Sequence, residues 1–448
     1  MTEIEQRTVR RVSKRLVPFL LVSYFVSYLD RTNLSFAALQ MNKDLGLTAG
    51  AFGFGAGAFF LTYFLFEVPS NLMLARAGAS RWIARIMVTW GLVSGAMVLV
   101  RGEASFYTVR ILLGAAEAGF FPGVIFYLGL WFPAAHRARI ISLFMVSVPL
   151  SVVVGAPLSG ALLSLDGALG LRGWQWVYIV EAVPAVVLGV VTFFYLSDSP
   201  KDARWLPDEQ RAWLGARLAA ERAEAKADAG HVPVLRALTH PRILALAVVD
   251  VAICSVNTGV GVFLPQIIQG FGVRSDVGVT LTTAVPYLVA AVGMVLWSRH
   301  SDRTGERRLH TAVPLGLAAL GIAGAVWIPG ALPKMVCLCG VMFGLYAMQP
   351  VFWTLSMTFL TGAAAAGGVA AINSIGNLAG FVSPYAMGSA KDATGSFSAG
   401  MLGIACTGVL GVVVVLLVGR ARGRGAAGRP ADGARPPAAR SGQPGGGD

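Results

Sequence analysis

Four charged residues interrupt stretches of sequence that are otherwise apolar. Asp30 and Arg31 lie in one such stretch near the start of the chain, and Arg110 and Glu117 lie in another. A carboxyl group withdrawn from water can keep its proton up to nearly neutral pH, and a neighbouring arginine opposes that effect. A guanidinium group also matches a carboxylate, because two parallel hydrogen bonds can form between them. These residue types can therefore bind a proton and an organic anion in one place.

Helical spacing places the two carboxyl groups at similar depth. At 1.5 Å per residue, Asp30 lies about 21 Å along its helix from one end, and Glu117 lies about 20 Å along its own helix from the opposite end. Arg110 and Glu117 are two turns apart on one helix face, whereas Arg31 points about 100° away from Asp30. We expect Asp30 and Glu117 to carry protons and Arg31 to bind a carboxylate. The alternative is a buried charge cluster that holds the two helices together.

The elements that position these residues are predicted to be membrane-spanning helices. The chain has 448 residues, of which 55% are hydrophobic and only 13% are charged, with a mean hydropathy of +0.66. Soluble domains carry about 25% charged residues, so a soluble enzyme and a secreted disulfide-rich domain are disfavoured. A helix needs about 20 apolar residues to cross a bilayer. Twelve stretches qualify, which predicts an all-α membrane protein: 16–39, 51–75, 82–100, 104–132, 140–165, 174–197, 242–269, 277–298, 309–328, 334–360, 364–390 and 397–419.

The basic residues predict how the chain is oriented. Of the 36 Lys and Arg residues, 28 fall in the termini and in the loops on the same side as the termini, and 6 fall in the loops on the other side. Cytoplasmic segments carry such an excess, so we expect both termini in the cytoplasm and the protein in the inner (plasma) membrane. The same distribution accounts for the net charge of +13, and we expect the lipid bilayer but no nucleic acid as a partner.

The chain divides into two sets of six predicted helices. A polar linker separates them, and the pattern within 207–227 predicts an amphipathic helix. We expect this helix to be solvated; the alternative is that Trp213, Leu214 and Leu218 lie against the membrane face of the bundle. The last segment is rich in Gly, Pro and Arg and is predicted to be disordered. The predicted boundaries are a cytoplasmic N-terminus at 1–15, a first six-helix bundle at 16–197, the linker at 198–241, a second bundle at 242–419 and a cytoplasmic tail at 420–448.

A short repeat relates the two halves. When the halves are aligned with an offset of about 227 residues, a turn after the second predicted helix matches a turn after the eighth. Both turns combine Gly with charged residues that can pair with neighbouring helix ends, so we expect them to form a gate and the halves to be related by an axis along the membrane normal. The predicted gate residues are Arg76, Gly78, Asp302, Arg303, Gly305 and Arg307.

Six motifs occur in order on the expected helices. The second gate turn, SDRTGERR at 301–308, resembles that of the major facilitator superfamily. The others resemble the anion:cation symporter branch of that family: YLDRTN at 28–33, EVPSN at 67–71, Arg110 to Gly123, Trp174 to Pro184, and LPQII at 264–268. The resemblance spans residues 16 to about 419. Ala75 departs from the Asp usual in the first gate turn, and Thr258 and Phe263 depart from a frequent Tyr and Trp.

The resemblance implies a fold and a set of site residues. It implies twelve helices in two pseudo-symmetric six-helix bundles, with Arg31 contacting the anion and Arg110 belonging to the proton-coupling network. For each polar residue that we expect to line the site, a hydrogen bond between helices is the alternative role. The candidate lining residues are Tyr28, Tyr63, Gln266, Trp353, Asn373 and Asn377.

The function that these features indicate is proton-coupled uptake of a small organic carboxylate by alternating access. Family members carry sugar acids, tartrate, phthalate and hydroxyphenylacetate-type acids. We expect a monomer that is not an enzyme, with no metal and no cofactor besides the coupling proton. One alternative is an exporter or uniporter of a neutral or drug-like solute. A membrane-bound sensor or enzyme is a weaker alternative, since the chain has no soluble domain, no catalytic constellation and no Walker motif for ATP.

Three further carboxyl groups lie within predicted helices. Glu67 and Glu181 lie nearer the helix ends, and we expect them to have structural or gating roles. Asp250 matches no motif, and the sequence predicts no role for it.

Overall fold

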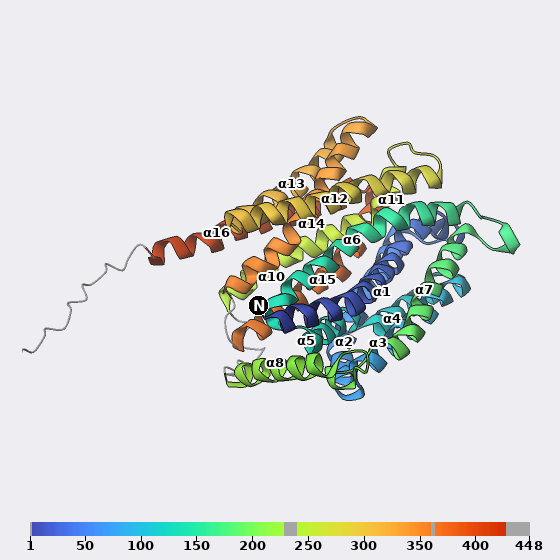
Figure 1. Cartoon of the computed structure of the whole chain (residues 1–448). Coiled ribbons are helices and arrows are strands. Elements are labelled where there is room, and N and C mark those ends of the chain that lie inside the picture. Colours follow the sequence, from blue (N-terminus) through green and yellow to red (C-terminus); the bar gives the residue numbers. More distant parts are fainter. Residues whose placement is uncertain (1, 228–239, 360–362, 427–448) are drawn as a thin grey trace, which may run out of the picture.

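The computed structural model describes residues 2–227, 240–359 and 363–426, and these residues are almost entirely helical (Figure 1). Short 3-10 turns and one π-helical segment complete the longer elements. The α-helices are α1 (Glu3–Asp44), α2 (Ala49–Ala77), α3 (Ala79–Gly95), α4 (Glu103–Glu117), α5 (Phe120–Trp131), α6 (Ala134–Leu163), α7 (Gly173–Tyr195), α8 (Asp208–Ala227), α10 (Pro241–Cys254), α11 (Gly261–Gln269), α12 (Asp276–Thr304), α13 (Arg308–Trp327), α14 (Ala331–Phe359), α15 (Ala363–Thr394) and α16 (Ser398–Ala426).

The prediction of an all-α, twelve-helix membrane fold is confirmed. Eleven segments of the described chain are long and apolar enough to cross a membrane, with α4–α5 and α10–α11 each counted as one span. The twelfth is α15, which has 32 residues but carries polar and small residues such as Asn373, Asn377 and Gly380 in place of large apolar ones. The predicted tail begins too early, because α16 continues to Ala426; the rest of the tail lies outside the described residues.

Two predicted helices are interrupted close to residues of interest. The stretch predicted as one helix over 104–132 is divided, because Gly119 adopts a left-handed conformation with a φ of 87° between α4 and α5. Glu117 is therefore the last residue of α4. Between α10 and α11, Ser255–Val260 forms a π-helical segment. Such segments widen a helix locally and are frequent at functional sites.

The helices pack as two groups, which we call the first half (α1–α7) and the second half (α10–α16). In the first half α3 packs on α7, α2 on α4 and α1 on α6, and in the second half α14 packs on α12 and α13. The N-terminus, α8 and the end of α16 lie at one end of the molecule, which we call the terminal face (Figure 1). The other end, where α1 ends and α2 begins, is the opposite face.

The two halves are in close contact at the opposite face. Glycines allow the backbones of α2 and α15 to touch: a Cβ added to Gly53 would lie 2.2 Å from the carbonyl oxygen of Pro384, and one added to Gly388 would lie 2.0 Å from that of Ala49. The helix pair α6–α12 also bridges the halves. No residue larger than glycine fits at Gly53 or Gly388 in this arrangement.

Polar contacts reinforce the closure of the opposite face. Asp392 accepts hydrogen bonds from the backbone N–H groups of Ala49 (3.0 Å) and Gly50 (2.7 Å) at the start of α2. Gln40 donates to Asp276 across the halves at 2.8 Å. Within the described part of the chain, these hydrogen bonds between the two halves all lie at this face. The structure therefore shows a conformation closed at the opposite face.

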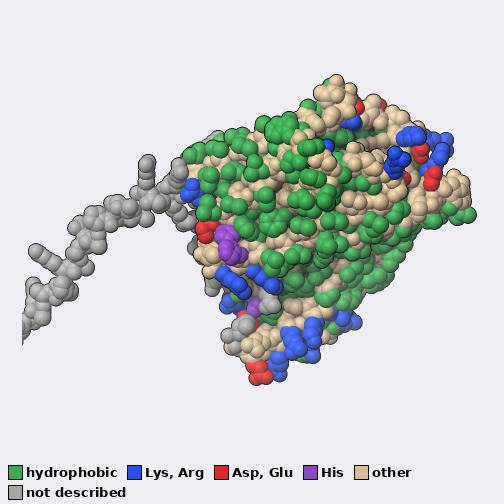
Figure 2. Space-filling model, turned by 90° about the horizontal axis from the view of Figure 1, so that it is seen from above, with side chains coloured by type: hydrophobic (Ala, Val, Ile, Leu, Met, Phe, Trp, Pro, Cys, Tyr) green, Lys and Arg blue, Asp and Glu red, His purple; other side chains and the backbone are tan. Residues whose placement is uncertain are grey.

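The surface agrees with a membrane-embedded body. Hydrophobic side chains cover the broad middle of the visible face, and Lys and Arg side chains gather toward its ends (Figure 2). Exposed Leu, Val and Phe residues on the spanning helices belong to this apolar belt. Because lipid tails are apolar, such a belt favours a position within the bilayer.

The linker helix α8 forms where the amphipathic pattern predicts it, but the expectation that it is solvated is wrong. Leu214 and Leu218 are buried, at 1% and 3% exposure, and α8 packs against α1 and α5. Glu221 of α8 also accepts hydrogen bonds from the backbone of Ala134 and from Arg137. The apolar stripe of α8 is thus covered by the first half.

Candidate functional site

The centre of the candidate site is an ion pair between α1 and the end of α4. Arg31 donates through Nε to Glu117 Oε1 at 2.7 Å, and Ser27 Oγ donates to the same oxygen at 2.9 Å. Ser27 and Arg31 are one helical turn apart, so they share the face of α1 that meets α4. Glu117 is 1% exposed, and burial of a carboxylate requires such partners.

Asp30 lies on an adjacent face of α1 and joins α3 to the site. Its Oδ1 accepts hydrogen bonds from Ser94 Oγ of α3 and from Asn33 Nδ2 at 3.1 Å. Asp30 Oδ2 and Glu117 Oε2 are both buried and have no hydrogen-bond partner among the described residues. Each carboxyl group therefore has one free oxygen that a proton can occupy.

Arg110 does not pair with Glu117 in this conformation. It donates to the backbone carbonyl oxygens of Gly55 (3.2 Å) and Ala56 (3.5 Å) in α2. Its guanidinium carbon lies 4.8 Å from the ring centre of Phe59. The sequence placed Arg110 and Glu117 on one wall, and both do line the same cavity, but their polar partners differ.

An aromatic cage surrounds the guanidinium group of Arg31. The ring centres of Tyr28, Phe59 and Tyr63 lie 5.3, 5.4 and 5.0 Å from its central carbon. Contacts of a cation with aromatic rings are favourable by about 0.5–2 kcal/mol each, depending on solvent exposure. The cage orients Arg31 and leaves it 21% exposed, so the group remains accessible from the site.

A small cavity separates the charged groups from the second half. It has a volume of about 30 Å³, room for about two water molecules. A dicarboxylate of four carbons is larger than this, so binding requires the walls to move apart. The lining residues are Asp30, Arg31, Leu34, Ala56, Phe59, Phe60, Arg110, Leu113, Glu117 and, from α11 of the second half, Val262.

Four predicted lining residues of the second half are not among the described residues that line this cavity. Gln266 has a buried Nε2 without a partner among the described residues, and Trp353 packs on the ring of its neighbour Phe352. Asn373 and Asn377 are partly buried on α15. Their part in binding stays a prediction.

Four residues of the cluster were not predicted as site residues. Ser27 and Asn33 lie one turn from the predicted charges on α1, and this spacing could have drawn attention to them. Ser94 on α3 and Phe59 on α2 belong to other helices. Nothing in the sequence indicates which of their faces turns toward α1.

The two predicted gate turns lie at the terminal face. In the first, Gly78 has a φ of 93°, and Asp198 caps the following helix by accepting from the backbone N–H of Ser80 at 2.8 Å. Arg76 is exposed. A local acid therefore caps this turn although position 75 holds Ala.

In the second gate turn, Asp302 pairs with Arg307 at 2.7 Å, Gly305 has a φ of 68°, and Arg303 is exposed. Glycine suits that left-handed position because it has no Cβ. Within the described residues, the polar contacts of Asp198 with Ser80 and of Asp302 with Arg307 both lie inside a single half.

The remaining buried acids have different surroundings. Glu181 accepts from Ser159 at 2.8 Å and so joins α7 to α6. Asp250 presses against Gly376 of α15, where an added Cβ would lie 2.0 Å from Asp250 Oδ2. Asn71 donates to the backbone oxygen of Glu67.

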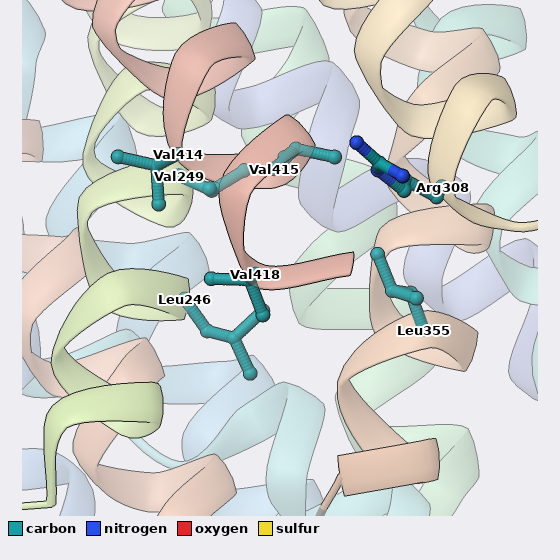
Figure 3. Close-up of a pocket in the computed structure, with 7 residues that line it drawn as sticks. All are labelled: Leu246, Val249, Arg308, Leu355, Val414, Val415 and Val418. Carbon is teal, nitrogen blue, oxygen red and sulfur yellow. The ribbon is translucent and has the colours of Figure 1, made fainter. Parts of the chain in front are cut away.

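A second small cavity, of about 10 Å³, lies among α10, α14 and α16 (Figure 3). Leucine and valine side chains line it, and the guanidinium group of Arg308 stands at its edge. Arg308 donates to the backbone oxygen of Leu416. The cavity holds about one water molecule and has aliphatic walls, so it does not suit a carboxylate.

Comparison with known proteins identifies the family. The model of the Major Facilitator Superfamily matches residues 20–384. The protein named "Putative tartrate transporter" from Agrobacterium vitis is 49% identical over 419 residues, covering 94% of this chain and 96% of that protein. The chain belongs to the major facilitator superfamily, and it is therefore a multi-pass membrane transporter and not an enzyme.

Two further similarities bear on function and on fold. The "Quinolone resistance transporter" of Acinetobacter baumannii is 39% identical, over 93% of this chain and 96% of that protein. A bacterial homologue of the human lysosomal transporter Spinster, solved in an inward-facing, occupied conformation, has a TM-score of 0.71 at 16% identity and covers 94% of this chain and 98% of that one. This second similarity concerns the fold alone.

Proposed function

We propose that the protein takes up a small organic carboxylate together with protons. The observation that carries this proposal is the ion pair of Arg31 with Glu117 beside a cavity with free carboxyl oxygens. The 49% identity to a protein named for tartrate makes a dicarboxylate of that class the first substrate to test.

Competition for Arg31 provides the coupling. In this structure Glu117 neutralises Arg31. An incoming carboxylate needs the same guanidinium group, and two carboxylates against one arginine repel each other. When Glu117 takes up a proton, it no longer competes, and Arg31 can bind the anion. Anion binding is then favoured by proton binding, and by linkage the reverse also holds.

A second carboxyl group allows a second proton. Moving one negative charge inward against 100 mV costs about 2.3 kcal/mol. A dianion carried with two protons crosses without net charge, and Asp30 lies in the same cavity with its own free oxygen. We therefore assign Asp30 as the second proton carrier. Arg110, held by α2 and lining the same cavity as the two acids, limits the charge that the site accumulates in each state.

The arrangement of the whole protein follows from the same proposal. The terminal face is cytoplasmic, as the distribution of basic residues predicts, and the protein works as a monomer in the inner membrane. The proton is the only coupling ion. The closed opposite face then faces outward, and the conformation seen is the one from which substrate leaves to the cytoplasm.

Uptake into proteoliposomes tests this function. Labelled tartrate is offered with an inward proton gradient, and exchange is measured without a gradient. Glu117→Gln and Asp30→Asn are expected to lose gradient-driven accumulation while retaining part of the exchange, because a neutral amide resembles the protonated acid but cannot release a proton. Glu103→Gln, an exposed acid on α4, is the control. Unchanged accumulation in both site variants would contradict the proposal.

Export of a drug-like solute is the second candidate, since a 39% identical relative is named for quinolone resistance. Arg31 distinguishes a neutral solute from a carboxylate as the substrate. A carrier of neutral solutes would retain transport in Arg31→Ala, whereas a carboxylate carrier would lose it.

A further inference from the structure

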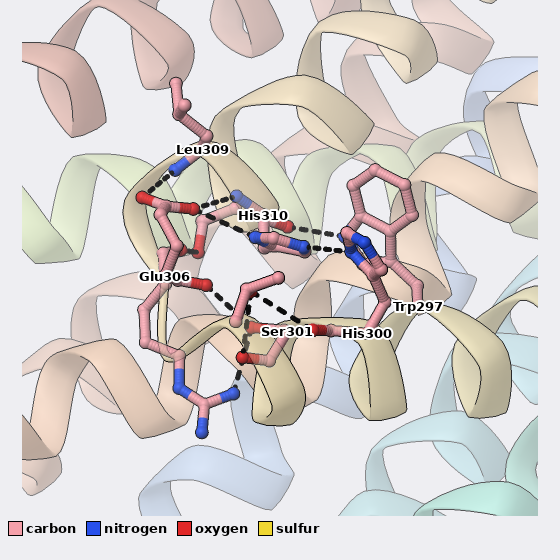
Figure 4. A network of polar contacts seen from close by, with 9 residues as sticks. Trp297, His300, Ser301, Glu306, Leu309 and His310 are labelled. Atoms are coloured by element: carbon pink, nitrogen blue, oxygen red, sulfur yellow. Dashed lines mark hydrogen bonds and ion pairs between the residues drawn. The ribbon is translucent and has the colours of Figure 1, made fainter.

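A chain of titratable side chains lies outside the candidate site, at the turn between α12 and α13. His300 Nδ1 and His310 Nε2 are 2.7 Å apart, and His310 Nδ1 lies 2.9 Å from Glu306 Oε2 (Figure 4). His310 is buried, with 8% exposure, whereas His300 is exposed. We call Glu306, His310 and His300 the histidine clasp.

Glu306 provides a fixed negative charge at one end of the clasp. Partial burial acts to raise the pKa of Glu306, but hydrogen bonds from the backbone of Leu309 and from His310 outweigh it, and the pKa lies below its usual value. Glu306 accepts from the backbone N–H groups of Leu309 (2.7 Å) and His310 (3.1 Å), which begin α13. An acid at this position caps the helix.

The number of protons on the two histidine rings determines which hydrogen bonds the clasp can form. With neutral rings, His310 donates through Nδ1 to Glu306 and accepts from His300. One added proton makes His310 an imidazolium that donates both to Glu306 and to His300, so both hydrogen bonds persist and become charge-assisted. A second proton would place two N–H groups against each other and break the contact. Histidine is the side chain that titrates between pH 5 and 8.

The other charged groups near the clasp are mostly basic. Arg299, Arg303 and Arg308 belong to the same helices, and Asp302 is already paired with Arg307. From α14 the ring of Phe343 contacts Trp297, and the described part of α14 has no titratable side chain at this end. From α16 the backbone oxygen of Leu416 binds Arg308; the arginine side chains from Arg420 on lie outside the described side chains. Glu306 is therefore the acid that stabilises a charged His310.

The clasp is connected to the second gate turn. Trp297 Nε1 donates to the backbone oxygen of His310 at 2.8 Å, and Ser301 Oγ donates to that of Glu306 at 2.9 Å (Figure 4). Arg307 donates to Ser301 and pairs with Asp302. While these bonds hold, the gate residues Asp302 and Arg307 are bound to their own turn and cannot bind the first half.

We propose that the histidine clasp is a proton-sensing site which, when singly protonated, holds the second gate turn in this self-contained form and favours the conformation closed at the opposite face. The site is separate from the Arg31–Glu117 pair. Where the terminal face is cytoplasmic, a consequence that rests on the proposed function, a fall in cytoplasmic pH slows the return of the carrier. Proton-coupled uptake would then limit itself.

Distances between the halves, measured without substrate or gradient, test the proposal. Spin labels are attached at Arg81→Cys of α3 and Arg242→Cys of α10, which are exposed at the terminal face, in a protein whose Cys254, Cys337, Cys339 and Cys406 are replaced. The protein is placed in nanodiscs, and the distances are recorded by pulsed electron paramagnetic resonance from pH 8 to pH 6. Each distance between the two labels represents one population of the protein. We expect the population with the longer distance, relative to that with the shorter one, to rise on the order of five-fold as the pH falls.

Substitutions show whether the histidine clasp, rather than another titratable group, causes the pH response. In His310→Gln the rise should be lost, because glutamine can bridge Glu306 and His300 but does not titrate. His300→Gln, at an exposed position, should reduce the rise, and His136→Gln, a histidine paired with Glu5, should leave it intact. The proposal would be overturned if His310→Gln responded to pH as strongly as the parent protein does, or if the parent protein did not respond at all. Neither outcome depends on proton-coupled transport.

Discussion

At the scale of residues, the site depends on which partner holds Arg31. The guanidinium group lies within an aromatic cage and pairs with Glu117, so its orientation is fixed before an anion arrives. Fixing a binding group in advance reduces the entropy lost on binding. In the proposed function, a proton on Glu117, rather than a large movement of Arg31, is the event that frees the guanidinium group for an anion.

Arg31→Lys is expected to weaken binding of a dicarboxylate even though the charge is kept. A lysine is a point charge and cannot form the paired hydrogen bonds of a guanidinium group. The loss should be about 10- to 100-fold in Kd, since a charge-assisted hydrogen bond contributes roughly 1.5–3 kcal/mol. Isothermal titration calorimetry on the purified protein measures it.

Arg76→Lys, at the exposed gate position, serves as the control and should bind as the unsubstituted protein does. Equal affinities in Arg31→Lys and Arg76→Lys would remove Arg31 from the anion site.

The sequence was sufficient to find the charged residues but not their partners. Asp30, Arg31, Arg110 and Glu117 stand out because ionised groups in a membrane are costly. The pairing of Arg31 with Glu117 depends on the rotation of α1 against α4, and the bond from Ser94 depends on α3. Such contacts are set by tertiary packing, which a single helix pattern does not contain.

At the scale of elements, glycines determine how closely the halves approach. The start of α2 touches α15 backbone to backbone, and Asp392 caps the α2 N-terminus from the other half. Negative charge at a helix N-terminus is favourable by about 0.3–1 kcal/mol. Closure of the opposite face therefore combines a steric fit with a modest electrostatic contact that can be broken on each cycle.

Gly53→Ala is expected to disfavour closure of the opposite face. The added methyl group would lie 2.2 Å from the Pro384 carbonyl oxygen, so α2 and α15 must separate. Transport should fall at least several-fold, and a cysteine placed in this contact should react faster with a membrane-impermeant thiol reagent. The matched control is Gly403→Ala, where no atom lies within 4 Å of the new Cβ. Equal labelling rates in the two variants would contradict the prediction.

The docked linker helix makes a different prediction. Leu214→Ala should destabilise the protein, because truncation of a buried leucine costs about 2–5 kcal/mol. The loss should appear as a lower Tm of the purified protein with its substrate affinity unchanged. Ala216→Ser, on the exposed side of α8, should leave the Tm within error. If Leu214→Ala had no effect on the Tm, α8 would not be docked on the first half in solution.

The helix boundaries show which features of the fold a pattern of residues is sufficient to predict. Long apolar stretches predicted the spanning helices well, and α8 followed from its amphipathic pattern. The break after Glu117 was missed although Gly119 lies at that position, because an apolar run is equally compatible with a continuous helix. A solvated α8 was preferred over one whose Leu214 packs on the bundle, because the pattern reveals an apolar stripe but not the surface that covers it.

At the scale of the whole molecule, two separate proton sites serve different purposes. Asp30 and Glu117 lie among the helices of the first half, and in the proposed function a proton on Glu117 allows an anion to take its place at Arg31. The histidine clasp lies at the terminal face of the second half, and we propose that a proton there stabilises the second gate turn. The proposed carrier thus couples transport to the gradient at its centre and responds to pH at its edge.

The central claim is that anion binding and proton binding are linked through Glu117, and proton uptake on substrate binding tests it most directly. The purified protein in weakly buffered solution is mixed with tartrate, and the pH change is followed with an indicator dye. We predict that the unsubstituted protein takes up protons on binding and that Glu117→Gln takes up fewer, with Glu103→Gln unchanged. Tartrate binding without proton uptake, or uptake that is the same in Glu117→Gln, would contradict the account.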